Sequence, residues 1–128
     1  NKETLLFQIW IEPNQFDIKP RWETINLKNE SEESIEVIAS GEKKYKESNI
    51  LKIYQNVSVI RINGSKQILN YKLEKDRHAY FVLSKGRIYI GENEINKRDG
   101  VYINGLNDIN FDFKENTELI LIDMPINN

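Results

Sequence analysis

The stretch RHAYFVLSKGRIYIGENEINKRDGVYI, residues 77–103, decides the fold class of this 128-residue chain. It contains three short runs, 79–84, 87–91 and 100–103, that are rich in β-branched and aromatic residues. Glycine and polar residues bound these runs, which is typical of β-strands joined by tight turns. We expect the first two runs to form a hairpin around Gly86.

The rest of the chain repeats this pattern of short strand-like runs between polar turns. The sharpest turn signal is NGS at 63–65, because Asn-Gly accepts the positive φ that a type I′ turn requires. We therefore expect 57–62 to pair antiparallel with 66–73. The remaining strand-like runs are 5–11, 22–27, 35–40, 50–55, 109–113 and 118–123.

No segment shows a period long enough for a regular helix, so the pattern predicts one all-β domain. Short strands with polar turns between them are typical of a jelly-roll barrel or sandwich. The polar stretch 28–34, with its acidic pair Glu32–Glu33, is interpreted as a solvated loop or a single helical turn. The basic cluster KKYK at 43–46 is interpreted as a solvated loop as well.

The composition excludes several classes of function. The chain has 18 basic and 20 acidic residues and a formal net charge of −2, which predicts neither a nucleic-acid partner nor a membrane partner. It has no cysteine, so disulfides, thiolate metal sites and cysteine nucleophiles are excluded. No apolar run approaches the ~20 residues that a bilayer requires, and no signal peptide is visible. We expect a cytoplasmic protein.

The segment FQIWIEPNQFDIKPRWETINL, residues 7–27, resembles the connecting segment of pirin-like proteins. In that family a strand reading Q-I-W-I is followed by a proline, a short spacer, a second proline and an aromatic–Glu pair. HAYFVLSKG at 78–86 and ELILIDMP at 118–125 resemble the last hairpin and the last strand of the same proteins. The matching positions in the first segment are Gln8, Ile9, Trp10, Ile11, Pro13, Pro20, Trp22 and Glu23.

Pirin-like proteins are bicupins, with two jelly-roll barrels in one chain. Their metal ligands, three histidines and a glutamate, lie in the N-terminal barrel. Some members cleave the flavonol quercetin with dioxygen, and others are linked to transcriptional co-regulation. The resemblance implies that this chain comprises a connecting arm, 1–27, and a C-terminal cupin barrel, 28–128, so that the ligands of the N-terminal barrel correspond to no residue here.

The same barrel could hold a metal only if it had its own ligands. In the general cupin pattern a His-x-His pair precedes a glutamate, which lies at a fixed spacing before the glycine of the hairpin. Counting back from Gly86 places Ala79 at the glutamate position and the histidine pair near Lys72 and Glu74. A redox metal needs three or four convergent ligands, and the chain has one histidine, so we expect no metal, no other cofactor and no catalytic residue.

The only histidine, His78, lies in an expected strand whose side chains alternate between two faces. One face carries His78, Tyr80 and Val82, and the other carries Ala79, Phe81 and Leu83. If Ala79 lies inside the barrel, His78 points outward and is a surface or interface histidine without a catalytic role. The alternative is a ligand pocket formed by His78, Tyr80, Tyr89 and Tyr102.

Two tryptophans, Trp10 and Trp22, flank the proline-bounded arm that contains Pro13 and Pro20. Tryptophan is enriched at interfaces and buries a large apolar area. The arm has two interpretations. Its tryptophans pack on the chain's own barrel, or the four residues form a docking surface for an N-terminal pirin-like barrel or for a second copy of the chain.

The sequence thus favours a metal-free C-terminal cupin domain with a structural or partner-binding role and no catalysis of its own. A first alternative is part of a quercetin 2,3-dioxygenase-like bicupin whose metal site lies on a separate N-terminal barrel. A second alternative is a small-molecule or sugar-binding barrel that uses its tyrosines and tryptophans. A barrel filled by Phe81, Leu83, Ile88 and Ile90 would count against this second alternative.

Overall fold

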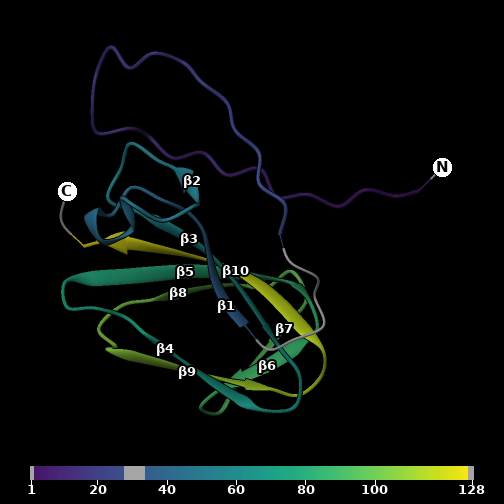
Figure 1. Ribbon diagram of the computed structural model, residues 1–128. Coiled ribbons are helices and arrows are strands. Elements are labelled where there is room, and N and C mark those ends of the chain that lie inside the picture. The colour runs from purple at the N-terminus through teal and green to yellow at the C-terminus, as the bar shows by residue number, and fades with distance from the viewer. Residues whose placement is uncertain (1, 28–33, 127–128) are drawn as a thin grey trace.

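The computed structural model describes residues 2–27 and 34–126, and Figure 1 shows the chain as two layers of β-strands with an extended arm. Within the described residues there are ten strands and one short 3₁₀ turn, η1 (Lys43–Tyr45). No described helix is long and apolar enough to cross a bilayer. The strands are β1 (Ser34–Ser40), β2 (Leu51–Lys52), β3 (Ser58–Gly64), β4 (Ile68–Lys72), β5 (Arg77–Lys85), β6 (Arg87–Ile90), β7 (Asn93–Asn96), β8 (Gly100–Ile103), β9 (Asp108–Phe113) and β10 (Thr117–Pro125).

The strands form two sheets that pack face to face. The larger sheet has six strands in the order β2-β1-β3-β10-β5-β8, and the smaller has four in the order β4-β9-β6-β7. All strand pairs are antiparallel except β1 with β2. The predicted all-β fold, a sandwich of two sheets, is therefore confirmed.

The core lies between the two sheets and is built by alternating residues of the central strands. On β5, Ala79, Phe81 and Leu83 are fully buried, while β9 contributes Ile109, Phe111 and Phe113 from the opposite sheet. The rings of Phe81 and Phe111 meet edge to face, 5.4 Å apart, and join the two layers. The outward direction of His78 and the inward direction of Ala79 follow from this register, as the sequence predicts.

The predicted hairpin between 57–62 and 66–73 is wrong. Asn63 and Gly64 belong to β3 itself, which pairs with β1 on one side and with β10 on the other. The turn follows at 65–67, where Lys66 has φ of 53°, and it carries the chain across to β4 in the smaller sheet. The Asn-Gly step signalled a nearby change of direction, but β3 is a central strand whose neighbours come from elsewhere in the chain.

The predicted hairpin around Gly86 is also wrong, again because the two strands lie in different sheets. β5 belongs to the six-stranded sheet and β6 to the four-stranded sheet, so the chain changes layers between them. Gly86 has φ of +90° at this crossing, a conformation that favours glycine. The hydroxyl of Thr117 accepts a hydrogen bond from the backbone N–H of Arg87 (3.1 Å) and fixes the crossing against β10.

Other boundaries also differ from the expected ones. The runs 5–11 and 22–27 form no strand, and the run 50–55 shortens to β2. β7 was not expected because it is polar, with Ile95 as its one buried residue. Of the expected loop 28–34, residues 28–33 and therefore Glu32–Glu33 lie outside the described residues.

Replacement of Gly86 by alanine should destabilise the domain strongly. A Cβ at this position would lie against the hydroxyl of Thr117 and within 2.6 Å of the carbonyl oxygen of Asn116. The left-handed backbone costs ~1–2 kcal/mol for a residue with a side chain, and overpacking adds ~1–3 kcal/mol. Urea unfolding should therefore show a loss of about 2–5 kcal/mol.

Gly91→Ala is the matched control, because Gly91 also has positive φ (+58°) but a Cβ there meets nothing within 4 Å. It should lose only the backbone contribution, about 1–2 kcal/mol. Equal losses in the two variants would contradict the close packing of the crossing at Gly86.

Candidate functional site

The outer faces of the two sheets, which point away from the core, differ in chemistry. The outer face of the four-stranded sheet is largely polar: the side-chain amide of Asn70 donates to the Asn110 side chain (2.8 Å), and Arg87 pairs with Glu94 (3.3 Å). Ile68 is an isolated apolar residue there. This face is suited to contact with water.

The outer face of the six-stranded sheet combines an apolar area with a charged one, in which the buried Arg61 pairs with Glu36 (3.1 Å) and lies 4.0 Å from Glu118. Two of its interior strands are apolar at consecutive positions, 79–83 on β5 and 119–122 on β10. Strands of this kind are typical of sheets that are covered on both faces. The outward residues that result are here called the outer patch: Val59, Val82, Ile120, Ile122 and Met124.

The arm, residues 2–27, runs over this face, on the side of the six-stranded sheet away from the four-stranded sheet (Figure 1). The backbone of the arm is hydrogen-bonded to the segment that follows β2. The N–H of Asn14 donates to the carbonyl of Tyr54 (2.8 Å), and the carbonyl of Glu12 accepts from the side chain of Gln55 (3.1 Å). The guanidinium of Arg21 donates to the carbonyl of Lys52 (2.8 Å) and lies over the Tyr54 ring. The arm is thus anchored along one edge of the face.

The arm's large side chains remain exposed. Trp10 is 86% exposed and Trp22 is 85% exposed, and Pro13 and Pro20 are exposed as well. The interpretation that the tryptophans pack on the chain's own barrel is therefore wrong. Among residues 2–27 and 34–126, neither indole ring is covered by other side chains to more than a small extent.

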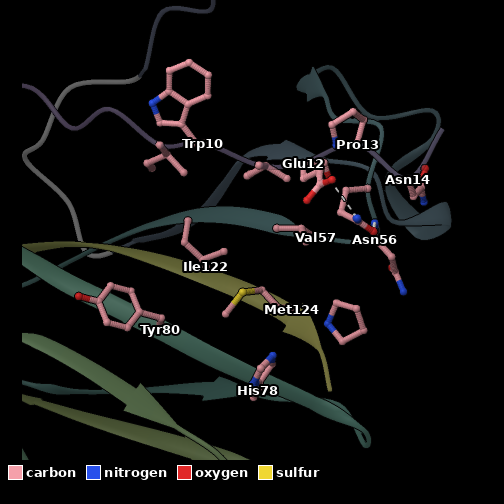
Figure 2. Close-up of a pocket in the computed structure, with 14 residues that line it drawn as sticks. Trp10, Glu12, Pro13, Asn14, Asn56, Val57, His78, Tyr80, Ile122 and Met124 are labelled. Atoms are coloured by element: carbon pink, nitrogen blue, oxygen red, sulfur yellow. Dashed lines mark hydrogen bonds between the residues drawn. The ribbon is translucent and has the colours of Figure 1, made fainter. Parts of the chain in front are cut away.

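A groove of about 820 Å³ separates the arm from the sheet (Figure 2). Trp10 and Pro13 line the arm side, Ile122 and Met124 form part of the floor on β10, and His78 and Tyr80 line the β5 side. The walls are mainly apolar but also include polar side chains, such as those of Asn14, Gln55 and Asn56. Met124 was not expected at this site. It lies opposite His78 on the neighbouring strand β10, and the alternation of side chains along β10 places it on the outer face.

Three of the four expected pocket residues come together beside this groove. The Nδ1 atom of His78 lies 2.6 Å from the hydroxyl of Tyr102, and the two rings meet edge to face. Tyr80 lies directly opposite Tyr102 on the neighbouring strand β8. Tyr89 does not join them, because it lies on β6 in the other sheet, below the ammonium group of Lys114.

The interior offers no room for the ligand that a sugar-binding barrel requires. Phe81, Leu83 and Ile88 are completely buried in the core, and the half-buried Ile90 packs against it. This packing counts against the hypothesis that the barrel binds a small molecule or a sugar in its interior.

The residues that stand at the positions of cupin metal ligands are not suited to bind a metal ion either. Ala79 is buried in the apolar core, Lys72 is exposed, and Glu74 is exposed and paired with Lys44 (2.8 Å). Among residues 2–27 and 34–126 no three histidine, cysteine, aspartate or glutamate side chains lie close enough together to bind an ion. We therefore derive no chemical step through a metal in this lobe.

One end of the barrel is closed by buried charges that the sequence analysis missed. Arg77 donates from Nε to the Asp123 carboxylate (2.5 Å) and from Nη2 to the carbonyl of Asn56 (3.0 Å). The hydroxyl of Tyr71 donates to the other oxygen of Asp123 (2.5 Å). The sequence did contain a signal for them. Side chains of a strand alternate between its two faces, and Arg77 and Asp123 are spaced so that they share the inward face with the core residues of β5 and β10.

A second part of this closure is built around Glu42. Its carboxylate accepts from the hydroxyl of Ser58 and lies 3.8 Å from Arg77. The hydroxyls of Ser40 and Ser58 are 2.7 Å apart, and Ser40 also accepts from the backbone N–H of Glu42 (3.0 Å). Each buried charge therefore has a partner, as the low dielectric of the interior requires.

Burial and the neighbouring Asp123 carboxylate both raise the pKa of Tyr71 far above its usual value. The fold thus favours the neutral phenol, so the stability that Tyr71 contributes is complete below its unfolded pKa of about 10 and is lost as the pH rises beyond it. In urea titrations, the wild type should lose up to about 1.4 kcal/mol per pH unit more than Tyr71→Phe above pH ~10. Identical slopes in the two proteins would contradict this buried pair.

The comparisons with known proteins agree with this geometry. Residues 37–124 match the family described as the quercetinase C-terminal cupin domain. The chain belongs to this family. Its resemblance to pirin-like proteins is thereby confirmed, and the fold described above is that of a C-terminal cupin domain.

Two curated relatives share the name "Putative quercetin 2,3-dioxygenase". ZMO1337 of Zymomonas mobilis is 34% identical over 122 residues, which cover 94% of this chain and 51% of that protein. PA1210 of Pseudomonas aeruginosa is 27% identical over 122 residues and covers 94% and 52% respectively. This cupin chain therefore spans about half the length of the curated relatives it matches.

Solved structures show the same fold. YhhW from Escherichia coli superposes with a TM-score of 0.80 at 21% identity, over 91% of this chain and 48% of that one. A second YhhW structure, in complex with nickel(II), gives a TM-score of 0.77 at 20% identity, over 88% of this chain and 47% of that one. YhaK from the same organism gives 0.59 at 24% identity, over 71% and 41% respectively.

Proposed function

We propose that this cupin domain is a structural, partner-binding lobe without catalysis of its own, and that it docks an N-terminal pirin-like barrel on the outer patch and the arm. The observation that carries the proposal is the outer patch of the six-stranded sheet, which the arm covers only in part while the arm's own tryptophans stay exposed. In this proposal the lobe is metal-free, because its ligand positions are occupied by a core alanine and two exposed side chains.

The exposed apolar residues support this location for the interface. Leu5, Leu6, Trp10, Phe16 and Trp22 are each more than 65% exposed, and all lie on the arm. Large apolar side chains exposed together on one segment are typical of protein–protein contacts in soluble proteins. Among the described residues, the polar outer face of the four-stranded sheet has no comparable cluster. The interface is therefore proposed on the side of the lobe that carries the arm.

The backbone of the arm supports the same partner. Residues 5–11 have strand-like composition, yet they form no strand and no backbone hydrogen bond to another described residue. They lie over the face of the six-stranded sheet, where the strands below already pair with one another. Because an extended segment with free N–H and C=O groups can add to a sheet edge, a second β-barrel is a suitable partner for it.

The four arm residues expected from the sequence supply anchors for such a contact. Trp10 and Trp22 present large rigid rings, the kind of side chain that carries much of the energy of an interface. Pro13 and Pro20 restrict the backbone between them and so lower the entropy that the arm loses on binding. The curated relatives are about twice as long as the match, which leaves room in them for a second barrel.

Calorimetry with the part of Zymomonas mobilis ZMO1337 that this chain does not match tests the proposal. Trp10→Ala and Trp22→Ala should each weaken binding about 30-fold, the equivalent of ~2 kcal/mol. Both side chains are exposed in the free chain, so the unfolding free energies of the two variants should stay unchanged.

Ile68→Ala is the matched control, because Ile68 is 64% exposed on the outer face of the other sheet. It should bind like the wild type. Self-association of the chain that is sensitive to the same tryptophans would make a second copy the occupant. Binding that ignores both tryptophans, or no binding at all, would overturn the docking surface.

A second candidate function is suggested by the names of the two curated relatives: a part of a quercetin 2,3-dioxygenase whose metal site lies on a separate N-terminal barrel. The same preparations distinguish it, by metal analysis and by dioxygen uptake on a flavonol. Uptake by the mixture alone would favour this second function, with the partner supplying the metal. Uptake by the isolated chain would contradict the first proposal.

A further inference from the structure

The chain contains two Asn-Gly steps, Asn63–Gly64 and Asn104–Gly105, and the fold places them in opposite environments. Asn-Gly is the dipeptide in which an asparagine side chain is attacked with least steric hindrance by the next backbone nitrogen, because glycine has no Cβ. The two steps are equivalent in the sequence, so any difference between them comes from the fold.

The first step is held inside the six-stranded sheet. Asn63 is 4% exposed and lies between Ser34 on β1 and Glu118 on β10. Gly64 lies opposite Thr117, and a Cβ added to it would overlap the ring of Phe113. The attack requires the backbone to leave its extended conformation, which here means opening a central strand.

The second step has none of these restraints. Asn104 follows the last residue of β8 and is exposed, as is Gly105. Neither residue forms a hydrogen bond with another described residue. Gly105 has φ of +82°, and a Cβ there would meet nothing within 4 Å, so the backbone has space to rearrange.

We propose that Asn104 is a site of spontaneous deamidation in the folded chain, and that the fold protects Asn63. The backbone nitrogen of Gly105, losing its proton to water or base, attacks Cγ of Asn104. The new N–Cγ bond closes a succinimide ring, and the Cγ–Nδ2 bond breaks with the release of ammonia. Water then adds to one of the two ring carbonyls and opens the ring to aspartate or to isoaspartate, with no change in oxidation state.

Either product places a carboxylate at the end of β8 and changes the formal net charge from −2 to −3. The last residue pair of the ladder between β8 and β5 is Ile103 with Ala79, so position 104 lies just beyond it and the sheet remains paired. The new charge therefore appears at the edge of the six-stranded sheet, beside the strand that carries His78, without a loss of fold.

Incubation of the full chain in mildly alkaline buffer, followed by peptide mapping with mass spectrometry, tests the proposal. Conversion at Asn104 should exceed conversion at Asn63 by about tenfold or more, because the second site reacts only after local opening of β3. In urea, where the fold is absent, the two sites should convert at similar rates. Asn104→Gln should remove the main product, because the longer side chain cannot close the five-membered ring.

Equal conversion of Asn63 and Asn104 in the folded chain would overturn the protective role of β3. Conversion at Asn104 in urea but not in the folded chain would overturn the site itself. Isoaspartate-specific fragmentation should find both ring-opening products at position 104, and their absence there while the mass changes would assign the reaction to a different residue.

Discussion

A β-sheet with interior strands that are apolar at consecutive positions is typically covered on both faces, and the rest of this cupin domain depends on that constraint. β5 and β10 supply the consecutive apolar residues, 79–83 and 119–122. One face of the six-stranded sheet is covered by the smaller sheet, through contacts such as that of Phe81 with Phe111. Over the other face, in the part of the chain that the structure describes, lies the arm, which leaves Trp10 and Trp22 in solvent.

The closed end and the filled interior explain why the surface, rather than the inside of the barrel, is the candidate site. Arg77, Asp123 and Tyr71 form a buried network at one end, and aromatic and aliphatic side chains occupy the centre. Removing one partner of a buried ion pair leaves an uncompensated charge, so such networks hold one arrangement of strands.

Much of the fold could be predicted from the sequence because strand composition is a local property. Most strand runs were found, and the alternation around His78 placed Ala79 inside and Tyr80 outside correctly. The pairing of strands could not be predicted in the same way. The steps at Asn63–Gly64 and Gly86 mark changes of direction, but whether a chain turns back within one sheet or crosses to the other depends on distant strands such as β10.

The candidate site was predictable only in part for a related reason. The tryptophans and prolines of the arm were identified from their residue types, but their exposure depends on how many layers lie above the sheet. Arg77 and Asp123 were overlooked because charged residues are rarely buried, although their inward phase on two apolar strands was visible. Tyr89 and Tyr80 are both tyrosines, but they lie on different sheets. The residue type alone could not show this.

The central claim is that the outer face of the six-stranded sheet, with its arm, is incompletely covered in the isolated chain. The most direct measurement is the fluorescence of the two tryptophans in the dilute, isolated chain, together with their quenching by acrylamide. The account predicts emission close to that of free tryptophan in water and efficient quenching of both rings. Blue-shifted emission that resists quenching, at concentrations where the chain is monomeric, would show that the lobe covers its own tryptophans and would contradict the account.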